Sequence, residues 1–113
     1  ETFDLAVKKY PDAHPLFHSD RGFQYTSKLF KAKLDKQGME QSMSRVGRCI
    51  DNGPMEGFWG ILKCEMYYLN QFETYEKLAS AVEQFIYYYN HQRRQHKLNC
   101  LPPATYRSLL EAA

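Results

Sequence analysis

Two acidic residues of this sequence lie where predicted secondary-structure elements end or begin. Asp20 directly follows "PLFHS", residues 15–19, which has the pattern of a short buried strand. Glu56 lies in the first turn of a helix predicted to begin at Asn52 or Gly53. Two ionised carboxylates from separate elements suit a hard cation such as Mg²⁺, and two such ions can clamp the attacking and leaving oxygens of a phosphodiester. The pair therefore indicates candidate metal ligands.

Each acid also has an ordinary structural explanation when it is taken alone. Asp20 and the neighbouring Arg21 could form a surface ion pair in a turn. Glu56 could serve only its helix, because the dipole at a helix N-terminus stabilises a carboxylate. Glycines at positions 57 and 60, beside the face of Glu56, would leave room for a large partner to approach the backbone.

The elements that must position these acids alternate between helix and strand. Helices are expected over residues 2–10, 26–36, 53–69, 74–90 and 104–111, and strands over residues 15–19 and 39–43. Two strands joined by a helix form a βαβ unit, which is normally parallel and right-handed. Two strands make a thin sheet for this many helices, so we expect an α/β fold with further strands upstream of this chain.

Three of the predicted helices carry an apolar stripe at helical spacing. The stripes are Leu29, Phe30 and Leu34; Met55, Phe58, Trp59, Leu62, Met66 and Leu69, which are expected to face the core; and Tyr75, Leu78, Ala79, Val82, Phe85, Ile86 and Tyr89. Thr26 or Ser27, and Thr74, suit helix N-caps, and Gly38 suits a helix end. The segment "SRVGRCIDNGP", residues 44–54, holds two glycines and a proline and is predicted to be a mobile loop.

The composition fits one folded domain and says little about partners. The 113 residues are 43% hydrophobic and carry a net charge of +2, from which no nucleic-acid partner can be argued. Two acid-free intervals are basic, however, one with Arg45 and Arg48 and the other with Arg93, Arg94, Lys97 and Arg107. These intervals indicate either one positive face or a solvated basic surface.

The three cysteines form no CxxC pair, which argues against a disulfide framework or a zinc ribbon and fits a reducing cytoplasm. No apolar run approaches the roughly 20 residues that span a membrane, and no signal peptide is visible, so we expect no membrane partner. A zinc site from His91, His96 and Cys100 is disfavoured, because residues five apart do not share a helix face. Tyr87–Tyr89 could stack on bases or pack in the core, and His18 could orient a ligand or be a buried, hydrogen-bonded residue.

Four motifs carry a resemblance to a known family. They are "HSDRGFQYTS", "SMSRVG", "DNGPMEGFWGILKCE" and "YYNHQRRQHKLN" followed by "PPATY", in that order. Together they closely resemble the C-terminal half of the catalytic domain of bacterial insertion-sequence transposases, which are similar to retroviral integrases and carry a DDE triad on a ribonuclease-H-like fold. The resemblance covers about residues 14–107. Thirty-five residues, 21–55, separate Asp20 from Glu56, and this separation is typical of such a triad.

The resemblance implies roles for individual residues. Asp20 and Glu56 would be catalytic ligands of Mg²⁺ or Mn²⁺, with two ions in the intact site. A larger set would contact DNA, namely Arg21, Ser44, Arg45, Arg48, Asn52, Lys63, Arg93, Arg94, His96 and Lys97. Asp51 and Asn52 would fix the entry to the glutamate helix. For the cluster at residues 93–96, DNA contact and structural support are both open.

The first aspartate of the family's triad has no counterpart in this sequence. In the family it lies on a strand well upstream, whereas Asp4 and Asp12 fall in the helix and turn expected after that strand. The chain also begins with Glu1, so it is expected to be a piece of a longer protein. The expected fold is a partial ribonuclease-H-like integrase core that lacks the N-terminal three-stranded meander, with residues 1–113 as one partial domain.

The implied function is Mg²⁺-dependent DNA strand cleavage and strand transfer in DNA transposition. The expected partners are transposon-end and target DNA and further copies of the protein, in the bacterial cytoplasm. With one ligand missing, the fragment itself is expected to be inactive. The alternative is a non-catalytic remnant, or a DNA-binding and assembly module. Robust metal-dependent cleavage by this chain would refute the expectation of an incomplete site.

Overall fold

The computed structural model describes residues 1–113, which form two compact units. Unit 1 is Glu1–Glu56 and unit 2 is Gly57–Ala113. Helix α4, Gly53–Leu62, runs through the boundary between them. The single domain expected over residues 1–113 stays a prediction.

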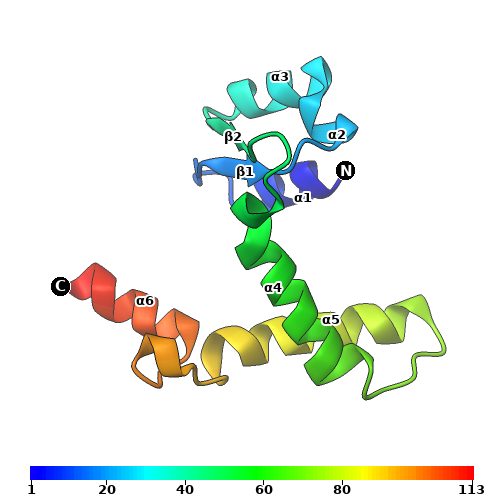
Figure 1. Cartoon of the computed structure of the whole chain (residues 1–113), viewed down its shortest axis with the longest axis vertical. Coiled ribbons are helices and arrows are strands. Elements are labelled where there is room, and N and C mark those ends of the chain that lie inside the picture. The colour runs from blue at the N-terminus through cyan, green and yellow to red at the C-terminus, as the bar shows by residue number, and fades with distance from the viewer. The chain divides into compact units, whose positions relative to one another are not determined.

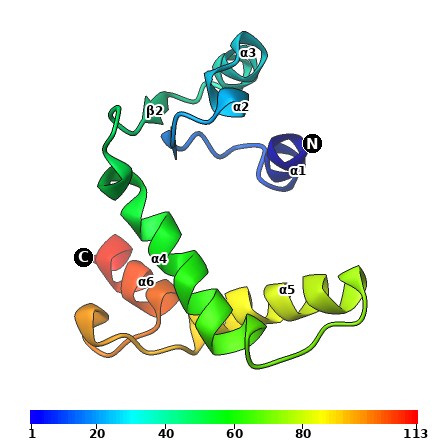
Figure 2. The ribbon, with the colours of Figure 1, turned by 45° about the vertical axis from the view of Figure 1, so that its right-hand side comes forward.

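Unit 1 is a small α/β unit with the predicted parallel strand pair. Its elements are α1 (Thr2–Lys9), β1 (Phe17–Ser19), α2 (Phe23–Thr26), α3 (Lys28–Lys36), β2 (Gln41–Met43) and a 3₁₀ turn at Cys49–Asn52 (Figure 1). β1 and β2 are parallel, with His18 opposite Ser42. The connection between the strands passes through α2 and α3 (Figure 2). This arrangement confirms the predicted βαβ unit.

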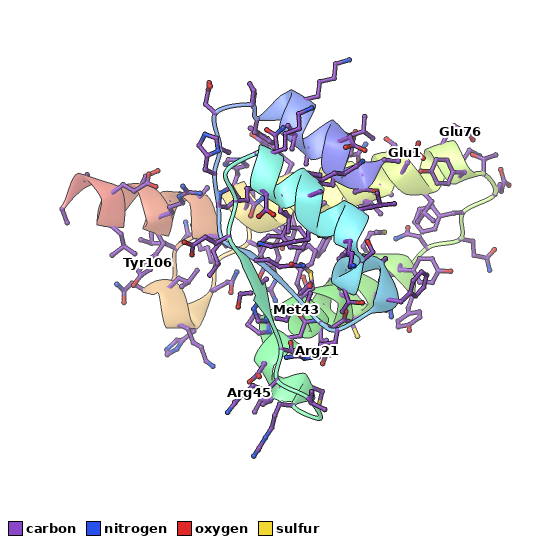
Figure 3. The ribbon with its side chains drawn as sticks, turned by 90° about the horizontal axis from the view of Figure 1, so that it is seen from above. Glu1, Arg21, Met43, Arg45, Glu76 and Tyr106 are labelled. Carbon is purple, nitrogen blue, oxygen red and sulfur yellow. The ribbon has the colours of Figure 1, made fainter.

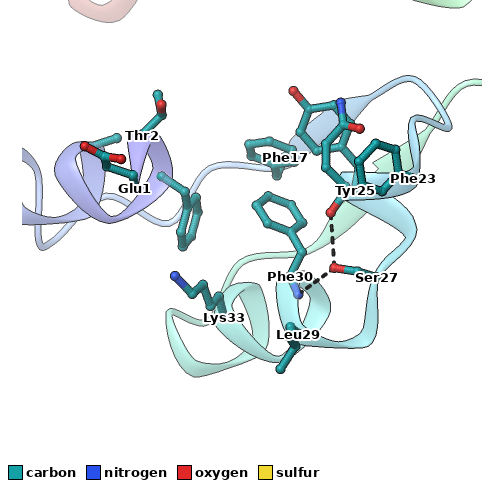
Figure 4. A pocket seen from close by; sticks show the side chains of 12 residues that line it. Glu1, Thr2, Phe17, Phe23, Tyr25, Ser27, Leu29, Phe30 and Lys33 are labelled. Carbon is teal, nitrogen blue, oxygen red and sulfur yellow. Dashed lines mark hydrogen bonds between the residues drawn. The ribbon is translucent and has the colours of Figure 1, made fainter.

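The start and end of α3 follow from local chemistry. Sequence spacing predicts one helix over residues 26–36, and the structure has the short α2 followed by α3. Ser27 lies between them and caps α3, because its Oγ accepts a hydrogen bond of 3.2 Å from the backbone N–H of Phe30 (Figure 4). Shortly after α3, Gly38 has a φ of +64°, a left-handed conformation that glycine adopts without strain.

Aromatic rings pack the helices of unit 1 against β1. Phe17 of β1 meets Phe3 of α1 and Phe30 of α3 edge to face, at centroid distances of 6.2 and 5.2 Å. The rings line an apolar cavity of about 640 Å³ (Figure 4). Leu34 of α3 is fully buried, whereas Leu29 of the same predicted stripe is 82% exposed. Only part of the predicted apolar stripe of α3 is therefore buried.

Unit 2 is helical. It contains the rest of α4, a π-helical turn at Lys63–Tyr67, α5 (Tyr75–His91), a 3₁₀ turn at His96–Leu98 and α6 (Pro103–Ala112). Thr74 caps α5 as predicted, because its Oγ accepts a 3.2 Å hydrogen bond from the N–H of Lys77. None of the chain's helices combines the length and the apolar character needed to cross a membrane.

Leu62, Met66 and Phe85 form the buried core of unit 2, with Phe58 and Tyr89 packed against them. The other two tyrosines of the Tyr87–Tyr89 run are exposed, so only Tyr89 joins the core as predicted.

The prediction that the whole stripe of residues 55–69 faces the core is wrong. Met55, Trp59 and Leu69 are exposed. Leu69 follows the π-helical turn, which changes the rotation per residue, so the helical period does not extrapolate across it. Tyr75 and Ile86, from the predicted stripe of α5, are exposed as well, because helical spacing defines a face without supplying a neighbour to cover it.

Candidate active site

Asp20 and Glu56 line the same cavity in unit 1. The cavity has a volume of about 470 Å³ and is also lined by Arg21, Ser44, Arg45, Val46, Gly47, Arg48, Cys49 and Asn52. It thus unites the two predicted metal ligands with five of the residues predicted to contact DNA. Residues that are far apart in sequence meet there because the end of β1, the loop after β2 and the first turn of α4 converge on one place.

The backbone at the end of β1 holds the Asp20 side chain. Its Oδ1 accepts a 2.9 Å hydrogen bond from the N–H of Gly22. A Cβ on Gly22 would lie 3.0 Å from that same oxygen and 2.9 Å from the amide nitrogen of Gln24. Glycine at this position therefore leaves the carboxylate its space.

The chain segment after Asp20 is tied to the end of β2. The Nε of Arg21 donates a 2.8 Å hydrogen bond to the carbonyl of Ser44, so Arg21 and Arg45 lie at the same end of β2, next to Met43 (Figure 3). Ser44 itself is buried, and its N–H donates to the carbonyl of Ser19 at 2.9 Å. The guanidinium of Arg21 thus both stabilises the rim of the cavity through this hydrogen bond and places a positive charge there.

His18 bridges two serine hydroxyls beside this rim. Its Nδ1 lies 3.0 Å from the Oγ of Ser42, and its Nε2 lies 3.4 Å from the Oγ of Ser44. The ring is hydrogen-bonded as predicted, but it is exposed and not buried. Exposure follows from its place on β1, whose Ser19 neighbour takes the buried side.

An ion pair closes the loop between β2 and α4. Asp51 accepts three hydrogen bonds from Arg45: at 2.9 Å from its backbone N–H, at 3.0 Å from Nε and at 2.8 Å from the guanidinium Nη2. These bonds hold the pKa of the Asp51 carboxyl well below its usual range, with the Arg45 side chain as the main cause. These bonds, which we call the Arg45–Asp51 clasp, join residues six positions apart in the loop that was predicted to be mobile. Because its charge is paired within the chain, Arg45 is not a free cation.

Acidification is expected to open this clasp. Because the pKa of Asp51 is lowered in the folded chain, the clasp contributes fully above the ordinary aspartate pKa of about 3.9 and is lost as the pH falls further. The measurement is the NMR shift of the Arg45 N–H between neutral pH and acid, with circular dichroism as the check on the fold. Asp51→Ala, which removes both carboxylate oxygens, should give the open-loop shift at every pH, and a wild-type shift at neutral pH equal to that of Asp51→Ala would contradict the clasp.

Glu56 is exposed in the first turn of α4 and has no hydrogen-bond or ion-pair partner in the chain. Beyond the backbone of their own helix, added Cβ atoms at Gly57 and Gly60 would meet no atom within 4 Å. This open space agrees with the expectation that the start of the helix can admit a large partner.

The donor set of the cavity fits a hard divalent cation. Asp20 and Glu56 offer carboxylate oxygens, the ligands that Mg²⁺ and Mn²⁺ prefer, and Mg²⁺ keeps several waters when few protein ligands are present. The chain has no group of three His, Cys, Asp or Glu side chains placed to hold an ion. Asp20 and Glu56, which line one cavity, stay two candidate ligands of such a site.

The other predicted DNA-contacting residues belong to unit 2. Lys63 is exposed at the first position of the π-helical turn. Arg93 is turned toward Glu65, and Arg94, His96 and Lys97 are exposed. Two ion pairs were not predicted from the sequence: the Arg93–Glu65 pair, whose members are 28 positions apart, and the Arg45–Asp51 clasp. Only the clasp had a local signal, an arginine and an aspartate flanking a glycine-containing loop.

Residues 56–109 match the integrase core domain family. A transposase-like protein of Haemophilus influenzae is 46% identical over 103 residues, which are 91% of this chain and 48% of that protein. The putative transposase InsK for insertion element IS150 of Escherichia coli is 44% identical over 106 residues, 93% of this chain and 38% of that protein. The transposase for IS904 of Lactococcus lactis is 35% identical over 89 residues, 79% and 35% of the two chains.

These matches confirm the resemblance seen in the motifs: part of the chain matches the integrase core domain, and most of it is similar to insertion-sequence transposases. The chain spans about half or less of the length of these relatives. No solved structure matches it.

Proposed function

We propose that this chain is part of a DDE transposase that performs metal-dependent DNA strand cleavage and strand transfer. The observation that carries the proposal is the shared cavity of Asp20 and Glu56, which is also lined by Arg21 and by Arg48, and neither arginine has an ion-pair partner in the chain. Carboxylates for a metal beside cations for phosphate are what phosphodiester chemistry needs. The similarity to proteins described as transposases supports the same conclusion.

Asp20 and Glu56 would hold the divalent cation, which when bound activates an attacking oxygen and neutralises charge on the phosphate. The hydrogen bond from Gly22 orients the Asp20 carboxylate before any ligand arrives. Arg48 carries a charge with no ion-pair partner in the chain and would attract the DNA backbone to the cavity. The Arg45–Asp51 clasp would keep the loop from collapsing onto the carboxylates.

A third carboxylate would come from a strand upstream of these residues in the complete transposase. The fold would then be the ribonuclease-H-like integrase core, with this chain as its second part and β1 next to the added strands. DNA and further copies of the transposase would be the partners, in the bacterial cytoplasm. The chain alone, with two of the three acids, would bind metal weakly and would not cut DNA, so within the transposase it would be necessary but not sufficient.

Manganese titration of the 113-residue chain tests the proposed site directly. Free Mn²⁺ is followed by its electron paramagnetic resonance signal, and Asp20→Asn and Glu56→Gln are each expected to weaken binding at least about tenfold. Asn at position 20 keeps an oxygen for the N–H of Gly22, so the local fold is retained. Glu40→Gln is the matched control, because Glu40 is an exposed acid of unit 1 outside the cavity. Equal Mn²⁺ binding by all four proteins would refute the site.

A further inference from the structure

The loop between α5 and α6 carries cations that nothing in the chain neutralises. Arg94 and Lys97 are exposed and take part in no ion pair. No acid lies between Glu83 and Glu111 in the sequence, and Glu111 is itself bound to Arg107 at 2.7 Å. The loop is therefore a local concentration of positive charge, although the whole chain is almost neutral.

Arg93 is different from its neighbours in this motif. Its guanidinium and Nε make three hydrogen bonds of 2.6 to 3.1 Å to the two carboxylate oxygens of Glu65. The guanidinium also lies 5.6 Å from the ring centre of Tyr89, and its side chain is only 24% exposed. A bidentate, partly buried ion pair of this kind fixes the relative positions of the two side chains. It also leaves the Arg93 charge unavailable to a ligand. Arg93 thus ties the end of α5 to the π-helical turn of unit 2.

Backbone hydrogen bonds link the two ends of the loop. The N–H of Gln95 donates to the carbonyl of Leu101 at 3.2 Å, and the carbonyl of Gln95 accepts from Leu98 and Cys100 at 2.9 and 3.1 Å. Asn99 and Cys100 have φ values of +53° and +58°, which non-glycine residues rarely adopt. Such conformations persist only where the surrounding structure determines them, and they are common at binding sites. The cations therefore project from a preformed frame, which lowers the entropy cost of binding.

We propose that Arg94, Lys97 and their loop form a second DNA-binding site, which holds the phosphate backbone without reading sequence. Arg93 is a positioning residue there, and its clasp with Glu65 sets the frame from which the cations reach the phosphates. Both statements deepen the proposed function and rest on it for the identity of the polymer. Within the motif at residues 93–97, Arg93 then has a structural role, and Arg94 and Lys97 bind DNA.

Salt dependence of DNA binding separates the two halves. Affinity of the chain for two unrelated fluorescent duplexes is measured between about 50 and 200 mM KCl, where each phosphate contact adds roughly one to the slope of log affinity against log salt. Arg94→Gln and Lys97→Gln should each reduce the slope by about 1, equally for both duplexes. Arg107→Gln, which removes a cation already paired with Glu111, should leave the slope unchanged. Unchanged slopes in the first two variants, or a loss confined to one duplex, would overturn the proposal.

Two variants of the clasp test Arg93. Arg93→Gln should leave the salt slope unchanged while hydrogen exchange speeds up at the loop amides of Cys100 and Leu101, and Glu65→Gln should behave in the same way. If Arg93 instead contacted DNA, Arg93→Gln would lower the slope by about 1. Under that alternative Glu65→Gln would free a cation and tighten binding. Either of these results would refute the positioning role.

The DNA-binding test of this loop does not depend on the Mn²⁺ test of the carboxylate site. Manganese binding that ignores Asp20 and Glu56, together with the expected salt slopes, would remove the proposed catalytic site and leave the loop. Absence of DNA binding by the chain would remove the loop proposal and leave the Mn²⁺ test unaffected.

Discussion

Asp20→Asn and Glu56→Gln are each expected to lower metal-dependent strand cleavage by more than about 100-fold in a complete transposase that contains this chain. Altering a residue that hydrogen-bonds to a metal ligand typically lowers activity by up to about 100-fold, and loss of the ligand itself should lower it further. The two substitutions remove charge and leave side-chain size nearly unchanged, so the cavity that they line keeps its shape. The measurement is the single-turnover rate of DNA nicking with Mg²⁺ and again with Mn²⁺.

The controls for this result separate lost chemistry from lost structure. Glu40→Gln, outside the cavity, should cleave at the unmodified rate. DNA binding of the two site variants should not weaken, because neither Asp20 nor Glu56 donates to phosphate. Cleavage within a few-fold of the unmodified protein in either variant would show that the shared cavity is not the catalytic centre.

Leu34→Ala is expected to destabilise unit 1 by about 2 to 5 kcal/mol, the typical cost of removing a fully buried leucine side chain. The value combines the lost burial with the cavity that the removed side chain leaves behind. Domains of this size are stable by roughly 5 to 15 kcal/mol, so the loss is a large fraction of the total. Hydrogen exchange at the N–H groups of Phe17 and Ser44, which bond across the strand pair, reports on unit 1 specifically.

Leu29→Ala provides the matched control. It is the same substitution on the same helix, at a side chain that is 82% exposed, and it should change stability by less than about 0.5 kcal/mol. If the two variants were equally destabilised, the burial assigned to Leu34 would be wrong. A difference of several kcal/mol in stability between the two variants would show that Leu34, and not Leu29, faces the core.

Local rules predicted the elements of this chain well. Ser27 and Thr74 cap their helices through the expected hydrogen bonds, and Gly38 adopts the left-handed conformation that ends α3. The parallel pairing of β1 and β2 followed from the spacing of two strands around a helix. Such features depend on interactions within a few residues, or on a connection whose handedness is constrained, and these are visible in sequence.

Burial was predicted less well, because it depends on neighbours and not on period. Leu62 and Leu69 stand in one predicted stripe, yet the first is buried and the second is exposed beyond the π-helical turn. A hydrophobic pattern assigns a side chain to a face of a helix. Whether anything covers that face is decided by the rest of the fold.

The sequence by itself determined the resemblance to insertion-sequence transposases, the order of the elements and the two candidate carboxylates, since these depend on motifs and on spacing along the chain. Only the tertiary structure decided which charges are free. Arg45 and Arg93 have the same chemistry in sequence as Arg48 and Arg94, but the first two are bound to Asp51 and Glu65 and the latter two are not. An ion pair needs two side chains within a few ångströms, and for Arg93 and Glu65, 28 positions apart, that proximity exists only after the chain has folded.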